Sequence, residues 1–166
     1  MQRSHRLTGL FAYTLIEILL VISIIGVAVV AAIPTVSKFV YTQYAALTIR
    51  QIQQAINYAR SEAILHHQTV TICPSFNRYN CSNNWGQGLL VLVPNGNSRF
   101  FPTYVNSQVQ LSLVQSGFSN NSVQIQANGF SYTSGHFTYR ALNPTYIPQF
   151  NLYFNKGLRL YTSRTD

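Results

Sequence analysis

Carboxylates are almost absent from this chain, whose 166 residues include only 3 Asp and Glu. Paired acids carry out much of acid–base catalysis, and carboxylates are the usual ligands of hard metal ions. The sequence therefore leaves few candidates for either kind of site. Cysteine is also scarce, with Cys73 and Cys81 the only two.

Cations are in excess, because 11 Lys and Arg give a formal net charge of +8. Such a balance favours anionic partners such as nucleic acid, anionic lipid or polyanionic envelope material. A charge that serves only solubility is the alternative. With 47% apolar and 13% aromatic residues, the chain is not typical of disordered proteins. Its length indicates one domain, or one domain plus a membrane segment.

A long apolar segment follows the basic residues Met1–Arg6, and residues 18–36 carry no formal charge. As a helix, residues 15–36 would extend about 33 Å, enough to cross a bilayer core. Two interpretations are a secretory signal peptide, cleaved at the small residues Val30–Ala32, and an ordinary membrane anchor. A third must explain Glu17, since a carboxylate in a membrane helix costs about 2–3 kcal/mol.

The segment Phe11–Glu17 (FAYTLIE) resembles the processing site of type IV prepilins and pseudopilins. The resemblance implies that a prepilin peptidase cuts between Ala12 and Tyr13 and methylates the new N-terminus. The family usually has Gly before the cut, so Ala12 departs from the pattern and we expect slower processing. Gly26 and Pro34 also fall where pilin helices commonly carry these residues.

The same resemblance gives Glu17 a role in assembly. It implies that the carboxylate pairs with the methylated amine of a neighbouring subunit, whereas the alternative is a carboxylate that reaches the membrane interface. The orientation of the predicted transmembrane helix is inferred from the cleavage motif, which implies that the head lies in the periplasm. The predicted organisation is a leader (1–12), a transmembrane half-helix (13–36), an amphipathic half-helix (37–66) and a β-rich head (67–166).

The fold class predicted is α+β. Apolar residues at steps of three and four form one helical stripe, namely Ile49, Ile52, Ile56, Ala59 and Ala63. Five segments beyond it favour strands: Thr69–Cys73, Gly88–Val93, Val109–Val114, Val123–Ala127 and Phe137–Ala141. We therefore expect one long helix packed against a β-rich head.

A central segment sharpens the family resemblance. Residues 59–64 (ARSEAI) and 70–73 (VTIC), followed by Cys81, Trp85 and Gly88, resemble the GspH/FimT branch. That branch includes a minor pseudopilin of type II secretion and minor pilins of type IV pili. The likeness covers roughly the first 90 residues, and the rest of the head matches in pattern only.

The two cysteines predict a disulfide, because the loop between them would lie in the oxidising periplasm. Closing so short a loop would stabilise the fold by about 2–3 kcal/mol. A metal site that adds His66 and His67 to Cys73 and Cys81 is the alternative, but its spacing fits no standard zinc pattern.

No catalytic set emerges from the remaining residues. Ser61 lies near His66, but no nucleophile-elbow motif surrounds it. Trp85 is most simply explained by core packing at the start of a strand. We therefore expect no enzymatic activity, no cofactor and no bound metal.

The C-terminal residues predict a hairpin with a three-residue loop, Asn155–Gly157, and Gly157 in the left-handed conformation. This register would pair Tyr153 with Arg159 and Asn151 with Tyr161. It predicts a surface of cations and aromatic rings, the combination that binds phosphate backbones and stacks on bases. The candidate DNA-binding residues are Arg140, Tyr153, Lys156, Arg159, Tyr161 and Arg164.

FimT-type minor pilins are associated with DNA capture through a C-terminal Gly-Arg-x-Arg-like motif. Residues 157–160 (GLRL) depart from that motif. The family's role in DNA capture therefore extends to this chain only if Arg159 and Arg164 substitute for the motif's arginines. A cationic surface that contacts other pilus subunits, or only solvates the strand, is the alternative.

The resemblance predicts a minor type IV pilin in the inner membrane that assembles with other major and minor pilins or pseudopilins. It is expected to bind double-stranded DNA without sequence preference. A minor pseudopilin of type II secretion is the first alternative. The second is a periplasmic domain released by signal peptidase, with a mature N-terminus near Ile33.

Overall fold

The computed structural model describes residues 14–116, 121–142 and 149–165, except for the side chains of residues 31–35. The predicted leader, Ala12 and Tyr13 lie outside these ranges. The chain divides into two compact units, Met1–Ser37 and Lys38–Asp166. A helix, α1 (Leu15–His66), accounts for nearly all of the first unit that is described and begins the second.

Within the second unit, α1 is amphipathic as predicted. Ile49, Ile52, Ile56, Ala59 and Ala63 are all buried. Residues three and four apart lie on one face of an α-helix, so this stripe forms a continuous apolar surface. The predicted stripe is confirmed, and it is the face against which the sheets pack.

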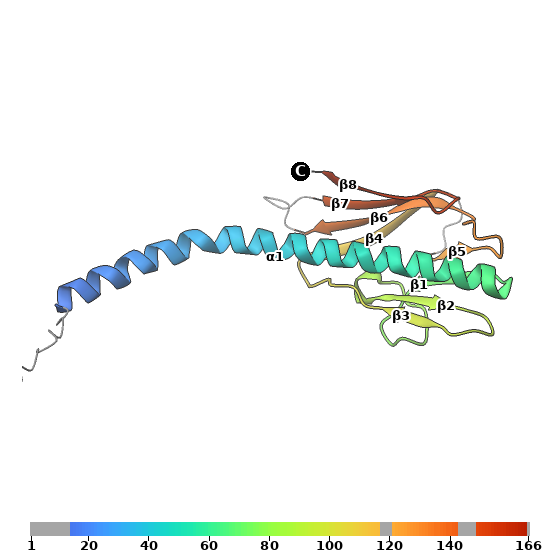
Figure 1. Ribbon diagram of the computed structural model, residues 1–166, viewed down its shortest axis with the longest axis horizontal. Coiled ribbons are helices and arrows are strands. Elements are labelled where there is room, and N and C mark those ends of the chain that lie inside the picture. Colours follow the sequence, from blue (N-terminus) through green and yellow to red (C-terminus); the bar gives the residue numbers. More distant parts are fainter. Residues whose placement is uncertain (1–13, 117–120, 143–148, 166) are drawn as a thin grey trace, which may run out of the picture. The chain divides into compact units, whose positions relative to one another are not determined.

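Two antiparallel four-stranded sheets make up the rest of the second unit (Figure 1). The first has the order β3-β2-β1-β5 and the second the order β4-β6-β7-β8. The strands are β1 (Val70–Pro74), β2 (Leu89–Leu92), β3 (Arg99–Phe101), β4 (Val109–Ser116), β5 (Val123–Ile125), β6 (Ser134–Ala141), β7 (Gln149–Phe154) and β8 (Leu160–Thr165). A short 3-10 helix, η1 (Trp85–Gln87), precedes β2.

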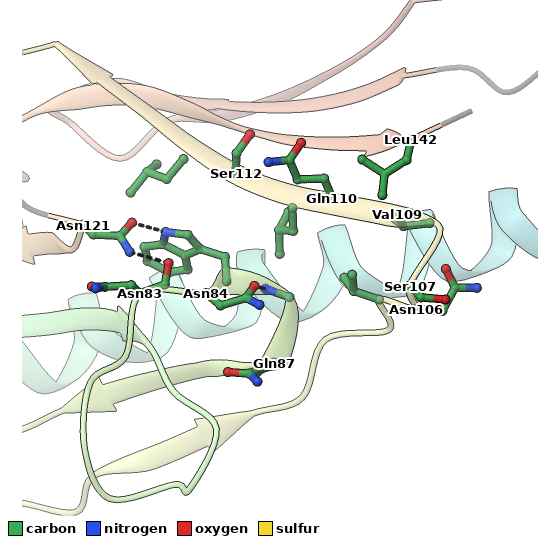
Figure 2. A pocket seen from close by; sticks show the side chains of 15 residues that line it. Asn83, Asn84, Gln87, Asn106, Ser107, Val109, Gln110, Ser112, Asn121 and Leu142 are labelled. Carbon is green, nitrogen blue, oxygen red and sulfur yellow. Dashed lines mark hydrogen bonds between the residues drawn. The ribbon is translucent and has the colours of Figure 1, made fainter. Parts of the chain in front are cut away.

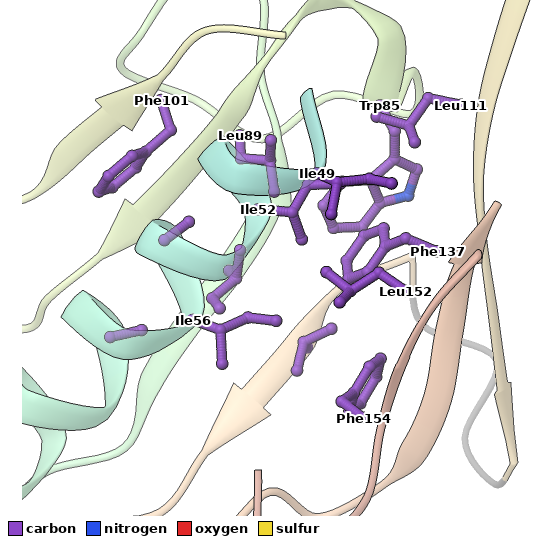
Figure 3. Packing of buried hydrophobic residues seen from close by; sticks show 14 of the residues in the cluster. Ile49, Ile52, Ile56, Trp85, Leu89, Phe101, Leu111, Phe137, Leu152 and Phe154 are labelled. Carbon is purple, nitrogen blue, oxygen red and sulfur yellow. The ribbon is translucent and has the colours of Figure 1, made fainter. Parts of the chain in front are cut away.

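One hydrophobic core joins the helix to both sheets. Ile52 and Ile56 of α1 lie in it with Leu89 of β2 and Leu152 of β7 (Figure 3). Trp85 is only 2% exposed, and its ring meets that of Phe137 edge-on, with 5.1 Å between centroids. The prediction that Trp85 is a core residue is confirmed, and this contact ties η1 to the second sheet.

All five predicted strands are present, with ends that differ by at most three residues. Strand β3 was missed. It is three residues long and follows a turn, so it shows no alternation of its own. It is a strand because Arg99, Phe100 and Phe101 pair with Val91, Leu90 and Leu89.

Candidate functional site

Glu17 lies in the first turn of α1 and is exposed. Its N–H donates to the Thr14 carbonyl at 3.0 Å, which closes the first turn of the helix. A carboxylate at this end interacts favourably with the helix dipole. Across the part of the chain that the structure describes, no helix combines the length and apolar character needed to cross a membrane. The span predicted over residues 13–36 stays a prediction.

The predicted disulfide is present. Cys73 and Cys81 are bonded, with their Cα atoms 5.5 Å apart. The intervening loop is ordered by Asn77, whose Oδ1 accepts the N–H groups of Tyr79 and Asn80 at 3.1 and 2.9 Å. The guanidinium of Arg78 lies over the Phe100 ring, 5.3 Å from its centroid. The loop is thus fixed at both ends and in its middle.

The described residues contain no group of three or more His, Cys, Asp or Glu side chains able to hold a metal ion. His66 instead lies beside Glu62 one helical turn earlier, with 3.2 Å between Nε2 and Oε2. The cysteines of the alternative metal set are bonded to each other.

The predicted register of the C-terminal hairpin is wrong. Strand β8 pairs with β7 so that Tyr153 lies opposite Tyr161, not opposite Arg159, and Asn151 lies opposite Ser163. The connection therefore spans residues 155–159, and Leu158, with φ +55°, takes the left-handed conformation expected for Gly157. Burial of Leu158 in the core explains this choice, because it is only 5% exposed.

This register changes which side chains share a face. His136, Tyr153 and Tyr161 lie side by side across β6, β7 and β8. The Tyr153 and Tyr161 rings are stacked, with centroids 4.7 Å apart and planes 5° apart, and His136 lies 4.9 Å from Tyr153. Tyr161 is 61% exposed. We call these three residues the aromatic row.

The four predicted DNA-binding cations do not form one cluster. Arg140 pairs with Gln110 near the end of β6, whereas Lys156 and Arg159 lie in the β7–β8 connection. Strand β7 separates these two ends by about 16 Å, at roughly 3.3 Å per residue. Arg164 lies opposite Phe150, and its guanidinium is 5.9 Å from that ring's centroid. Lys156 and Arg159 therefore lie beside the aromatic row, and Arg140 lies four residues from His136 on the same face of β6. Arg164 is on the opposite face, because Phe150 and Tyr153 point to opposite sides of β7.

A groove of about 680 Å³ lies along β4 and was not predicted (Figure 2). Figure 2 shows β4, carrying Gln110 and Ser112, on one side and the turn with Asn83, Asn84 and Gln87 on the other. We call it the carboxamide groove, because its polar lining is mostly Asn and Gln. In the sequence, Gln110 and Ser112 appeared only as polar positions within the predicted strand Val109–Val114.

Hydrogen bonds hold one wall of the carboxamide groove in place. The indole N–H of Trp85 donates to Oδ1 of Asn121, and the Asn121 side-chain amide donates to the Asn83 carbonyl at 2.9 Å (Figure 2). Asn84 caps η1, since its Oδ1 accepts the Gly86 N–H at 2.9 Å. The wall is therefore built onto a buried core residue.

The sequence of this chain resembles that of a known protein family. The sequence model described as "Type II transport protein GspH" matches residues 48–153. The chain belongs to the GspH family. No curated protein matches it.

Solved structures share the fold of this GspH-family chain. One crystal form of the type IV minor pilin FimU from Pseudomonas aeruginosa (strain PAO1) gives a TM-score of 0.54 at 16% identity, covering 74% of this chain and 89% of FimU. A second crystal form of FimU gives 0.50 at 17% identity, covering 70% and 90%. The predicted α+β fold, a long helix packed on a β-rich head, is confirmed.

Proposed function

We propose that this GspH-family protein is a minor pilin that takes part in assembling a type IV pilus. The observation that carries the proposal is the fold, a long helix packed on two antiparallel sheets, which it shares with the minor pilin FimU. The low acidic content and the basic C-terminus favour a pilus over a secretion machine. The protein acts as a structural subunit that assembles with other pilins, without an enzymatic reaction of its own.

The N-terminal half of α1 anchors the subunit in the inner membrane, and the head lies in the periplasm. The absence of formal charge over residues 18–36 supports this, as does the disulfide, which is typical of an oxidising compartment. Prepilin peptidase cleaves between Ala12 and Tyr13. The mass of the mature chain tests this step, because a methylated Tyr13 N-terminus is expected, whereas signal peptidase would leave an N-terminus near Ile33.

Deletion of the gene distinguishes the two machines. We expect the deletion strain to lose surface pili and to secrete normally, with pili restored by the wild-type gene. Normal piliation together with a block in type II secretion would overturn the pilus assignment. It would instead make the protein a minor pseudopilin of a type II secretion system.

The C-terminal surface binds double-stranded DNA without sequence preference in this proposal. The observation that favours it is the exposed Tyr161 ring stacked on Tyr153, with Lys156 and Arg159 in the adjoining β7–β8 connection and Arg140 farther along the same face of β6. Cations contact phosphates, and such contacts carry little sequence information. A gel-shift titration with the full chain in detergent is expected to show affinity that falls steeply with salt.

A further inference from the structure

The free edge of β4 opens onto the carboxamide groove. Strand β4 stands at one end of its sheet, where it pairs with β6 alone. The groove is lined by Val109, Leu111 and Leu113 of this strand. An edge strand presents main-chain N–H and C=O groups that can pair with another chain.

The register shows which main-chain groups point toward this edge. The Leu142 N–H donates to the Gln108 carbonyl at 2.8 Å, which makes this a hydrogen-bonded pair next to Val109↔Ala141. Bonded and non-bonded pairs alternate along an antiparallel ladder. The main chains of Leu111 and Leu113 therefore point away from β6.

These groups have no partner among the described residues. The Val109 N–H, which has the same orientation, donates to the Asn106 carbonyl at 3.1 Å. Within the described ranges, no hydrogen bond reaches the main chain of Leu111 or Leu113 from the groove side. Two donor–acceptor pairs, two residues apart, are thus presented to the groove in the spacing of a β-strand.

The side chains that line the carboxamide groove indicate which kind of ligand it would bind. The lining residues include no Asp, Glu, Lys, Arg or His. Its polar members are Asn83, Asn84, Gln87, Asn106, Ser107, Gln110, Ser112 and Asn121. Carboxamides both donate and accept hydrogen bonds, so they suit neutral groups such as the peptide unit. A charged occupant would lose its hydration without gaining an opposite charge.

A neutral sugar is less suited to the carboxamide groove than a peptide. Trp85 is the aromatic residue in the lining, but its ring is 2% exposed and its N–H is bound to Asn121. No aromatic face is thus available there for stacking. By contrast, the main-chain N–H and C=O groups of Leu111 and Leu113 can form hydrogen bonds with the main chain of a polypeptide.

We propose that the carboxamide groove binds an extended, uncharged segment of another polypeptide, which pairs with Leu111 and Leu113 as an added strand beside β4. Main-chain hydrogen bonds supply affinity in this mode of recognition, and the surrounding side chains supply selectivity. The site is separate from the aromatic row and does not depend on DNA binding.

The test uses a phage library of random dodecapeptides, selected against the full chain in detergent. Uncharged sequences are expected to be enriched. A synthetic copy of an enriched peptide is expected to bind Ser112→Lys at least about tenfold more weakly, because the lysine places an unpaired charge in the groove. Gln110→Lys provides a second groove variant. Ser163→Lys, on exposed β8, is the matched control and is expected to bind normally.

Amide hydrogen exchange decides whether the peptide forms a strand. The Leu111 and Leu113 amides are expected to exchange at least about tenfold more slowly with the peptide bound. Unchanged exchange at both amides, no enrichment, or peptide binding by both groove variants as tight as that of wild type would overturn the proposal. Binding of a neutral dextran that Ser112→Lys abolishes, with no peptide bound, would overturn it in favour of a carbohydrate site.

Discussion

At the scale of single residues, position within an element decides what a side chain can do. Leu158 shows this most clearly, since a left-handed conformation is uncommon for a residue with a Cβ. The sequence offered Gly157 as the residue suited to that conformation. Burial of the Leu158 side chain outweighs the local preference, and the choice moves Arg159 off the predicted face.

Glu17 provides the first prediction at this scale. Changing Glu17 to Val removes the only acidic residue of the first turn of α1 and leaves an apolar helix start. We expect normal insertion and processing but loss of incorporation into pili, because the partner amine would lose its counter-charge. Immunoblots of membrane and sheared-pilus fractions measure this. Glu17→Asp is the control, and normal incorporation of the Val variant would contradict the proposed role.

Tyr41 leads to a prediction about alkaline pH. Burial raises the pKa of Tyr41 from 10.0 to about 12, and the nearby main chain of Ala141 offsets part of this effect. Burial also raises the pKa of Tyr139, which packs 5.4 Å from Tyr41. Because the fold favours the protonated phenols, their contribution to stability is complete below pH 10 and is lost as pH rises toward 12.

We therefore expect Tyr41→Phe to lose less unfolding free energy than wild type between pH 9 and pH 12, by about 2 kcal/mol. Denaturant unfolding followed by the fluorescence of the single Trp85 reports on the head. Exposed Tyr161→Phe is the matched control and should keep the wild-type slope. Equal slopes for wild type and Tyr41→Phe would refute the assignment.

At the scale of elements, the regular parts of this fold were accessible from the sequence. The apolar stripe that includes Ile52 and Ile56 repeats with the period of a helix, so its burial could be predicted, and both residues are buried. Strands such as β4 were found because apolar residues alternate along them. The hairpin register was not accessible in the same way. A shift in loop length changes every cross-strand pair, and loop length depended on where Leu158 could be buried.

The loop closed by Cys73 and Cys81 allows a stability prediction at this scale. Replacing both cysteines by Ala is expected to lower the unfolding free energy by about 2–3 kcal/mol, since the unfolded chain would regain the entropy of an open loop. Trp85 fluorescence in a denaturant titration measures the change. Wild type under reducing conditions is the control and should match the variant. A difference below about 0.5 kcal/mol would show that the loop is already fixed without the bond.

At the scale of the whole molecule, the head presents two separate surfaces. The aromatic row lies on the sheet face of β6, β7 and β8, whereas the carboxamide groove follows the edge of β4. The first was partly predictable, because the aromatic and basic residues are concentrated near the C-terminus. The groove was not, because its walls come from residues 83–87, 105–107, 109–113, 121 and 142, which only the fold brings together.

DNA could be attracted by the overall positive charge or bound at the C-terminal surface, and two variants of equal net charge distinguish these possibilities. The variant Lys156→Gln, Arg159→Gln, Arg164→Gln lowers the net charge from +8 to +5. A control with Lys38, Arg50 and Arg60 changed to Gln on α1 reaches the same charge. If the C-terminal surface carries the phosphate contacts, only the first variant should lose affinity, and its salt slope should fall by about one per lost contact.

The comparison of these two variants separates a site from a diffuse field. Salt titrations of duplex DNA binding, made on full chains in detergent whose Trp85 fluorescence matches wild type, supply both slopes. Equal losses in the two variants would mean that the +8 charge attracts DNA without a defined surface. A smaller loss from the C-terminal variant than from the control would move the site to α1. Only a selective loss keeps the DNA contact at the β7–β8 connection and strand β8, where Lys156, Arg159 and Arg164 lie.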